Sequence, residues 1–315
     1  MVKKVSSGIN SNDPPAGVLA DVLDTLRFRG SIFFRSSLAS PWGMSLSNLT
    51  NPRFHIALSG DCYIGVDDAS STVINMQHMD ILMLPHGDMH WIADQPGREL
   101  TPSEQAGDAC ELGLPLFQNG KITNKLICGL INYEKDVLHP LIDALPTVLH
   151  FPDIKQDDPV WMTVLLIDAE MEKAQTNHTS IIDRLTEVLF MQLLNKHMND
   201  NKEITGFFAA LHDKRICRAL ELIHKNPEHP WTIDLLTEQV NLSRATLTRQ
   251  FNATVGVPPM TYLLKWRMIK AHNLIKHSSK TIDEISGMVG FSSARTLTKA
   301  FLNHYKMTPS QLRRK

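Results

Sequence analysis

Apolar residues recur at three- and four-residue spacings in several parts of the chain, which predicts amphipathic helices. One such helix is predicted over residues 17–28, and a pair of helices is predicted between residues 158 and 198. Between residues 31 and 131 the pattern changes to short apolar runs separated by Gly, Pro, Asn and Asp, which predicts strands. The clearest runs are 32–34, 54–58, 62–66, 81–84 and 126–131. Many short strands favour a barrel or a sandwich, and the stretch 94–125 is predicted as a long loop.

The last hundred residues contain one pattern written twice. Residues 232–234 (Thr-Ile-Asp) recur at 281–283, and residues 246–251 (Thr-Leu-Thr-Arg-Gln-Phe) recur at 296–301 as Thr-Leu-Thr-Lys-Ala-Phe. Each copy predicts a helix, a short turn and a second helix, with Thr232 and Ser243 as N-caps in the first copy. Gly256, followed by prolines, ends the second helix of that copy. The repeat therefore predicts two helix-turn-helix units in tandem.

The second helix of each copy has one apolar side and one polar, cationic side. Leu247 and Phe251 lie four residues apart and predict the buried side, as do Leu297 and Phe301 in the second copy. Short side chains let a helix approach a major groove, while Arg and Lys reach bases or phosphates. For a single helix of this kind, a polar face that only contacts solvent is the alternative interpretation. Because the pattern occurs twice, DNA binding is the favoured interpretation. The candidate DNA-binding residues are Arg244, Ala245, Thr248, Arg249, Ala294, Arg295, Thr298 and Lys299.

Charge is distributed unevenly between the two halves of the chain. Residues 205–315 contain 17 Lys and Arg against 7 Asp and Glu, whereas residues 1–204 contain 15 against 26. The net charge of −1 hides this asymmetry. A basic half that carries helix-turn-helix units is typical of a DNA-binding protein.

Residues 212–315 resemble the DNA-binding domain of the AraC/XylS family of bacterial transcription regulators. The matching positions are 230–232, 242–244, 249–251, Gly256 with Pro259, 262–263, 266–268, 289–291, Phe301 and Pro309. The resemblance implies a helix from about 259 to 275 that joins the two units and sets their recognition helices into successive major grooves. Three positions depart from the family pattern: Thr237 replaces Ala, Leu297 replaces an aromatic residue and Lys306 replaces Gly.

Residues 80–90 are similar to the second motif of cupin barrels, a strand followed by Pro-x-Gly-x-x-His. With the segment around His55, they resemble the cupin-type sensor domain of one AraC/XylS subgroup. The resemblance implies an effector pocket, for which His55, His86 and His90 are the candidate residues.

Two other kinds of chemistry are alternatives for this half. A metal-dependent cupin enzyme would use two or three His with a carboxylate, but only one His stands in the region of the first cupin motif, so no metal and no cofactor are predicted. Cys62 and Cys128 both fall on predicted strands and are candidates for a thiol redox switch. Against this, a buried Cys behaves as a small hydrophobic residue.

The sequence therefore predicts an α+β protein of two domains. A cupin-like β-barrel that senses an effector is expected over residues 1–155, a helical hairpin for dimerisation and relay over 156–200, a linker over 201–211 and an all-α tandem helix-turn-helix domain over 212–315. The predicted function is DNA-binding transcription regulation controlled by a small molecule, without enzymatic activity. Expected partners are double-stranded promoter DNA, a second copy of the chain and, because activators of the family contact it, RNA polymerase. No membrane-spanning segment or secretory signal is expected, which predicts a cytoplasmic protein.

Overall fold

The computed structural model of the chain describes residues 16–47, 51–66, 72–112, 116–133, 139–173, 180–200 and 205–314. The chain divides into two compact units. One, the sheet unit, contains Phe28–Tyr133 and Leu145–Lys202. The other, the helical unit, contains Met1–Arg27, Glu134–Ala144 and Glu203–Lys315. Two short segments from the first half of the sequence therefore group with the basic C-terminal half.

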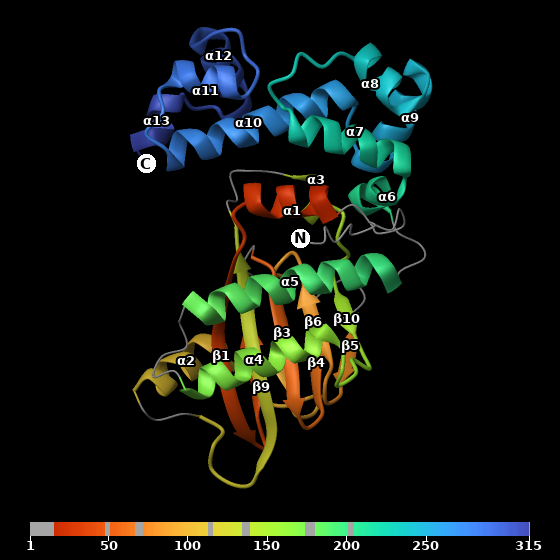
Figure 1. The fold of residues 1–315 in the computed structure, drawn as a ribbon. Helices are drawn as coiled ribbons and strands as arrows, with labels where there is room; N and C mark the ends of the chain where they lie inside the picture. The colour runs from red at the N-terminus through yellow and green to blue at the C-terminus, as the bar shows by residue number, and fades with distance from the viewer. Residues whose placement is uncertain are drawn as a thin grey trace, which may run out of the picture. The chain divides into compact units, whose positions relative to one another are not determined.

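The sheet unit has two five-stranded sheets, with the strand orders β1-β9-β3-β6-β10 and β5-β4-β7-β2-β8 (Figure 1). The strands are β1 (Arg29–Ala39), β2 (Gly43–Leu46), β3 (Arg53–Ser59), β4 (Cys62–Val66), β5 (Val73–Met76), β6 (Ile81–Leu84), β7 (His90–Ala93), β8 (Thr101–Pro102), β9 (Ile122–Asn132) and β10 (Leu149–Phe151). Buried side chains of both sheets form one core, among them Leu38, Ile64, Ile92 and Leu126. The mixed sheet and helix composition is as predicted, and closure of the two sheets into one barrel stays a prediction.

All five strands predicted from the sequence are present. The prediction missed β2, β5, β7, β8 and β10, which have only two to four residues each and so show too few alternations to be recognised. It also missed helix α2 (Ser103–Glu111), which lies inside the stretch predicted as a loop.

A pair of helices, α4 (Pro159–Lys173) and α5 (Ser180–Asp200), lies across the first sheet (Figure 1). Ion pairs tie both helices to β1. Arg35 Nε lies 2.7 Å from Asp168 Oδ1 of α4, and Arg29 Nη1 lies 3.2 Å from Glu187 Oε1 of α5. The predicted helical pair is therefore packed on its own sheet.

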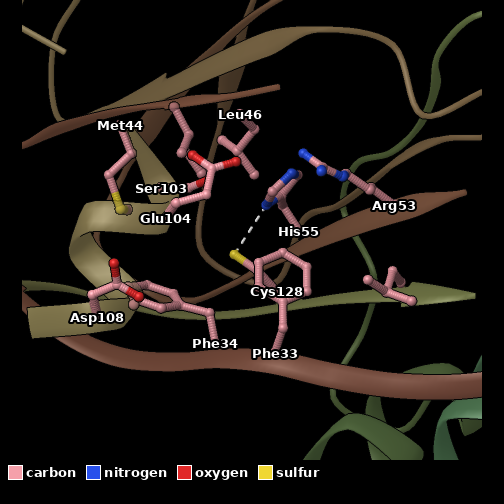
Figure 2. Close-up of a pocket in the computed structure, with 13 residues that line it drawn as sticks. Phe33, Phe34, Met44, Leu46, Arg53, His55, Ser103, Glu104, Asp108 and Cys128 are labelled. Carbon is pink, nitrogen blue, oxygen red and sulfur yellow. Dashed lines mark hydrogen bonds between the residues drawn. The ribbon is translucent and has the colours of Figure 1, made fainter. Parts of the chain in front are cut away.

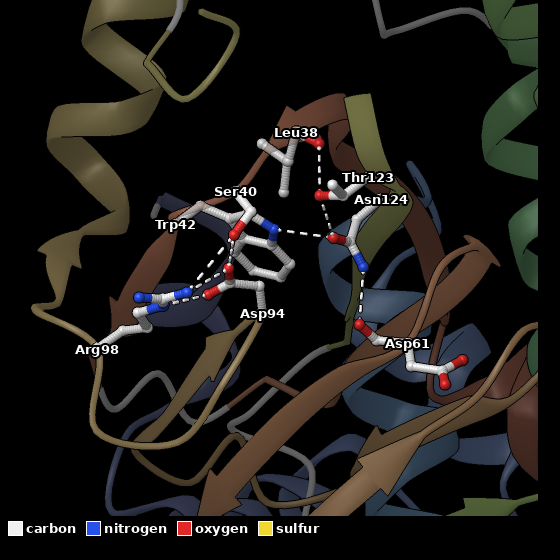
Figure 3. A network of polar contacts seen from close by, with 8 residues as sticks. All are labelled: Leu38, Ser40, Trp42, Asp61, Asp94, Arg98, Thr123 and Asn124. Carbon is white, nitrogen blue, oxygen red and sulfur yellow. Dashed lines mark hydrogen bonds and ion pairs between the residues drawn. The ribbon is translucent and has the colours of Figure 1, made fainter. Parts of the chain in front are cut away.

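A buried polar network connects the two sheets at one end of the core (Figure 3). The Trp42 indole N–H, just before β2, donates to Asn124 Oδ1 on β9 at 3.0 Å. The amide of Asn124 then donates to the Asp61 backbone oxygen at 2.8 Å, in the turn between β3 and β4. Because Asn124 is buried, these bonds satisfy an amide that would otherwise cost stability.

The helical unit consists of α1 (Ala16–Thr25), α3 (Pro140–Asp143), α6 (Gly206–His212), α7 (Lys214–Lys225), α8 (Ile233–Val240), α9 (Arg244–Val255), α10 (Pro259–His277), α11 (Ile282–Met288), α12 (Ala294–Tyr305) and α13 (Pro309–Arg314). The predicted apolar stripe of α1 is buried, and α1 contacts α7 and α10 of this unit. Helix α6 covers most of the second half of the segment interpreted as a linker and ends one residue after it, and Phe207, Phe208 and Leu211 give it a buried face. Residues 201–204 of that segment lie outside the described residues.

Candidate nucleic-acid interface and binding pocket

Each copy of the repeat folds as a helix, a turn and a second helix. The predicted caps are present: Thr232 accepts from the Leu235 N–H, and Ser243 accepts from the Thr246 N–H. In the second copy Thr281 and Ser293 occupy the same positions with capping boxes. The helix α10 between the copies runs close to its expected bounds.

The second helices α9 and α12 expose the side that the sequence predicted. Leu247, Phe251, Leu297 and Phe301 are fully buried. The eight candidate DNA-binding residues fall on the other sides of these helices. Arg249, Arg295 and Lys299 are exposed, and no ion pair or hydrogen bond of their side chains is found within the described ranges. These three cations are therefore available to a ligand.

Arg244 differs from the other candidates because its guanidinium is already engaged. It forms a two-pronged ion pair with Asp234 on α8, and the pair lowers the pKa of the Asp234 carboxyl mainly through the hydrogen bond. Both groups are exposed, so the pair contributes little to stability. Its effect is to hold the start of α9 against α8.

Arg267 of α10 has a structural role. Its Nε donates to the Pro227 oxygen at 2.7 Å and its Nη2 donates to the His229 oxygen at 2.8 Å.

The departure at Lys306 is accommodated in the left-handed conformation that the family's Gly would adopt, with φ of 58°. This costs about 1 kcal/mol relative to Gly.

The sheet unit contains a cavity of about 370 Å³ that extends between its two sheets. Side chains from β1, β2, β3, β7 and β9 line it, together with the first turns of α2 (Figure 2). Phe33 and Phe34 both line it although they are consecutive, because β1 has a bulge between Ile32 and Phe34 where it pairs with β9. The volume is in the range of small-molecule sites.

A buried chain of hydrogen bonds runs along one wall of the cavity. His90 Nδ1 lies 2.8 Å from the Asp88 backbone oxygen, which can only accept, so this nitrogen carries the proton. His90 Nε2 must then accept from His55 Nε2 at 2.8 Å, and His55 Nδ1 accepts from the Cys128 thiol at 2.9 Å. All three side chains in this hydrogen-bond network are therefore neutral, and the tautomers of both imidazoles are fixed.

The electrostatics agree with this assignment. Burial lowers the pKa of His90 to about 4 and holds that of His55 well below its ordinary value. Burial also raises the pKa of the Cys62 thiol to about 12 and that of Cys128 further. Redox-active thiols have lowered pKa values, and burial shifts those of Cys62 and Cys128 in the opposite direction.

The three histidine candidates do not converge on one site. His55 lines the cavity and His90 lies directly behind it, whereas His86 donates its Nε2 proton to the Leu145 oxygen at 3.0 Å and does not line the cavity. His55 and His90 use all four ring nitrogens in hydrogen bonds, and no group of three metal-ligating side chains is found in the described part of the chain.

Sequence reasoning missed the most unusual residue of the cavity, Arg53. It stands in the central strand β3, opposite Leu84 and Leu130, and its residue surface is only 4% exposed. Arg53 is the first residue of β3 and directly precedes the predicted strand 54–58, so the available signal was a charged residue at the start of an apolar strand. Arg is rarely buried without a partner.

Two family models match the chain over most of its length. A family described as Cupin matches residues 17–199, and a family described as Helix-turn-helix domain matches residues 236–315. The chain belongs to the AraC/XylS family of regulators with a cupin domain. As a member of this family it is a transcription regulator and not an enzyme.

Curated relatives match this AraC/XylS protein over more than nine-tenths of its length. An HTH-type transcriptional regulator of Haemophilus influenzae is 29% identical, over 93% of this chain and 98% of its own length. The regulator AlkR of Acinetobacter baylyi is 25% identical, over 94% and 98%. Among solved structures, the DNA-binding domain of AdpA in complex with a target DNA is 26% identical and covers 31% of this chain and 90% of its own, with a TM-score of 0.29.

Proposed function

We propose that this AraC/XylS regulator reads promoter DNA with α9 and α12 and that a small molecule in the cavity of the sheet unit controls this binding. The observation that carries the first part is the pair of capped helices whose apolar sides are buried while Arg249, Arg295 and Lys299 stay exposed and unpaired within the described residues. Thr248 and Thr298 lie on the same helices and support these cations.

Arg249 and Arg295 are the proposed base-reading residues. An Arg fork matches the acceptor edge of guanine in the major groove, whereas Arg244 is held by Asp234 and serves the fold of the first copy. A regulator controlled by an effector needs a site for it, and the cavity lined by Arg53, His55 and Cys128 provides one.

Selection of bound sequences from a random duplex library, with the full chain, would define the operator. On that operator Arg295→Ala or Arg249→Ala should cost about 1–3 kcal/mol and relax specificity at one position. Arg218→Ala on α7, an exposed Arg that pairs with Glu221, is the matched control and should leave sequence preference unchanged. Unchanged operator affinity in the double variant Arg249→Ala/Arg295→Ala would contradict the proposal.

We also propose that the protein is a homodimer through α4 and α5. Met162, Leu165 and Leu166 lie at helical spacing on α4, and all three are about half exposed although α4 packs on the sheet with its other side. A dimer would cover these residues and present paired recognition helices to paired half-sites.

No helix in the described part of the chain combines the length and the apolar character that crossing a bilayer requires.

A further inference from the structure

The guanidinium of Arg53 is a buried cation whose hydrogen-bonding groups are largely unused. Its Nε and Nη1 have no partner among the described residues, although the residue is 96% buried by area. The negative charge of Glu104 acts on Arg53, but the Glu104 carboxylate accepts from Ser47 Oγ at 2.8 Å and forms no ion pair with Arg53 in the described ranges. Buried charged donors without partners are costly, so this arrangement is typical of a site that awaits an anion.

Arg53 lies at a defined place in the cavity. Its side chain extends from β3 beside His55 and directs its nitrogens towards the side that carries Leu46 and Glu104 (Figure 2). The remaining wall is predominantly apolar, from Phe33, Phe34, Met44, Leu46, Ile92 and Leu130. His55 and Cys128 add no charge, because their protons are fixed as described above.

The charge of the lining limits the kind of anion. Arg53 is the single cationic residue of the lining, which also contains the two carboxylates of Glu104 and Asp108. A dianion such as a phosphate monoester would find one cation and two repelling groups. A singly charged carboxylate suits the site better, since its two oxygens match the fork of a guanidinium.

We propose that the cavity binds a small monocarboxylic acid with a hydrocarbon body, with its carboxylate on Arg53 and its body against the apolar wall. This inference rests on the proposed role of the sheet unit as the effector-binding part and names the chemical class of the effector. A cationic amphiphile is the competing ligand, because Glu104 and Asp108 also line the cavity. Both carboxylates are exposed to solvent and do not need a partner, whereas the buried Arg53 does.

Calorimetric titration of the full chain with four eight-carbon probes tests the proposal. Octanoate should bind more tightly than octanol, octanamide and octylammonium, which share its chain and differ in their polar group. Arg53→Met should weaken octanoate binding about tenfold or more while octanol binding stays the same, which shows that the cavity is intact. Arg53→Lys, which keeps the charge and loses the fork, should fall in between.

Arg98→Met is the control, because Arg98 pairs with Asp94 outside the cavity. The Arg98→Met variant should bind octanoate as tightly as the parent protein does. If Arg53→Met does not fold, the octanoate affinity of Arg53→Lys tests the proposal in its place, and a weaker affinity than that of the parent supports it. Unchanged octanoate binding in a folded Arg53 variant, preferred binding of octylammonium, or no saturable octanoate binding to the parent would overturn the proposal. Octanoate binding that leaves operator affinity unchanged would instead count against effector control and leave the ligand assignment standing.

Discussion

At the scale of single residues, the hydroxyl of Tyr262 joins three parts of the helical unit. The Leu141 N–H donates to His139 Nδ1, so the other ring nitrogen carries the proton and donates to Tyr262 Oη at 3.0 Å. The Tyr262 hydroxyl then donates to His224 Nε2 at 2.7 Å. Through these two bonds the hydroxyl connects the segment at residue 139 with α7 and α10.

Tyr262→Phe should destabilise the protein by about 1–3 kcal/mol, because it leaves the Nε2 atoms of the two buried imidazoles His139 and His224 without a hydrogen-bond partner while the aromatic ring stays in place. Urea unfolding monitored by circular dichroism would measure the change. Tyr63→Phe on β4 is the control and should cost less, because the half-buried Tyr63 forms no hydrogen bond through its hydroxyl within the described residues. Equal effects of the two substitutions would show that the hydroxyl of Tyr262 contributes nothing specific.

Buried neutral histidines also predict how stability depends on pH. Burial lowers the pKa of His139 to about 3 and of His90 to about 4, whereas both titrate near 6.5 when unfolded. Between these values the unfolded chain binds more protons, so stability is complete above about pH 6.5 and falls as the pH decreases. The free energy of unfolding should fall by about 1.4 kcal/mol per pH unit for each such histidine. Urea titrations at pH 7.5, 6 and 5 would measure it, and a flat profile would contradict the assignment.

At the scale of elements, the second helix-turn-helix unit is fixed to the first through a close contact at its turn. Gly290, between α11 and α12, has φ of +79°, and a Cβ there would lie 2.7 Å from Arg267 Nη2 and 2.8 Å from the Glu228 backbone. Arg267 in turn holds the Pro227 and His229 carbonyls of the loop before α8. The turn of the second copy thus packs on the loop that precedes the first.

Gly290→Ala should therefore both destabilise the protein and weaken operator binding, because it displaces one recognition helix relative to the other. Gly256→Ala is a matched control: its φ is +81°, but a Cβ there meets nothing within 4 Å. The control should cost only the backbone strain, about 1 kcal/mol, and leave operator affinity unchanged at temperatures where the protein is folded. Thermal unfolding and gel retardation of both variants would test this, and identical behaviour would exclude a role for the contact.

At the scale of the whole molecule, the proposed dimer would depend on the apolar side of α4. Leu166→Glu places a carboxylate on that side and should raise the dimer dissociation constant about tenfold or more, because the charge would be buried at the interface. Light scattering at micromolar concentration would report the mass. Leu112→Glu, at a residue 77% exposed after α2, is the control and should leave the mass unchanged. A parent protein that is monomeric at these concentrations would rule out the proposed dimer.

The sequence predicted the parts of this molecule that repeat or alternate over several residues. The caps at Thr232 and Ser243 and the buried pairs of α9 and α12 followed from local pattern alone. The cavity did not, since it depends on a bulge in β1, on helix α2 and on Arg53, which lie far apart in the chain. Likewise, periodicity showed that α1 has an apolar stripe but could not show that the stripe packs on α7 and α10.

The chain passes between the sheet unit and the helical unit at four places, near residues 27, 133, 144 and 202. A hybrid regulator in which residues 203–315 are fused to a foreign sensor would lack α1 and His139. Without α1, the side of α7 that it contacts would be uncovered, and without His139, Tyr262 would lose a hydrogen bond. Such a graft would expose bare apolar surface and aggregate more readily. Engineers who exchange sensors in this protein should keep all three segments of the helical unit and replace only the two stretches between them.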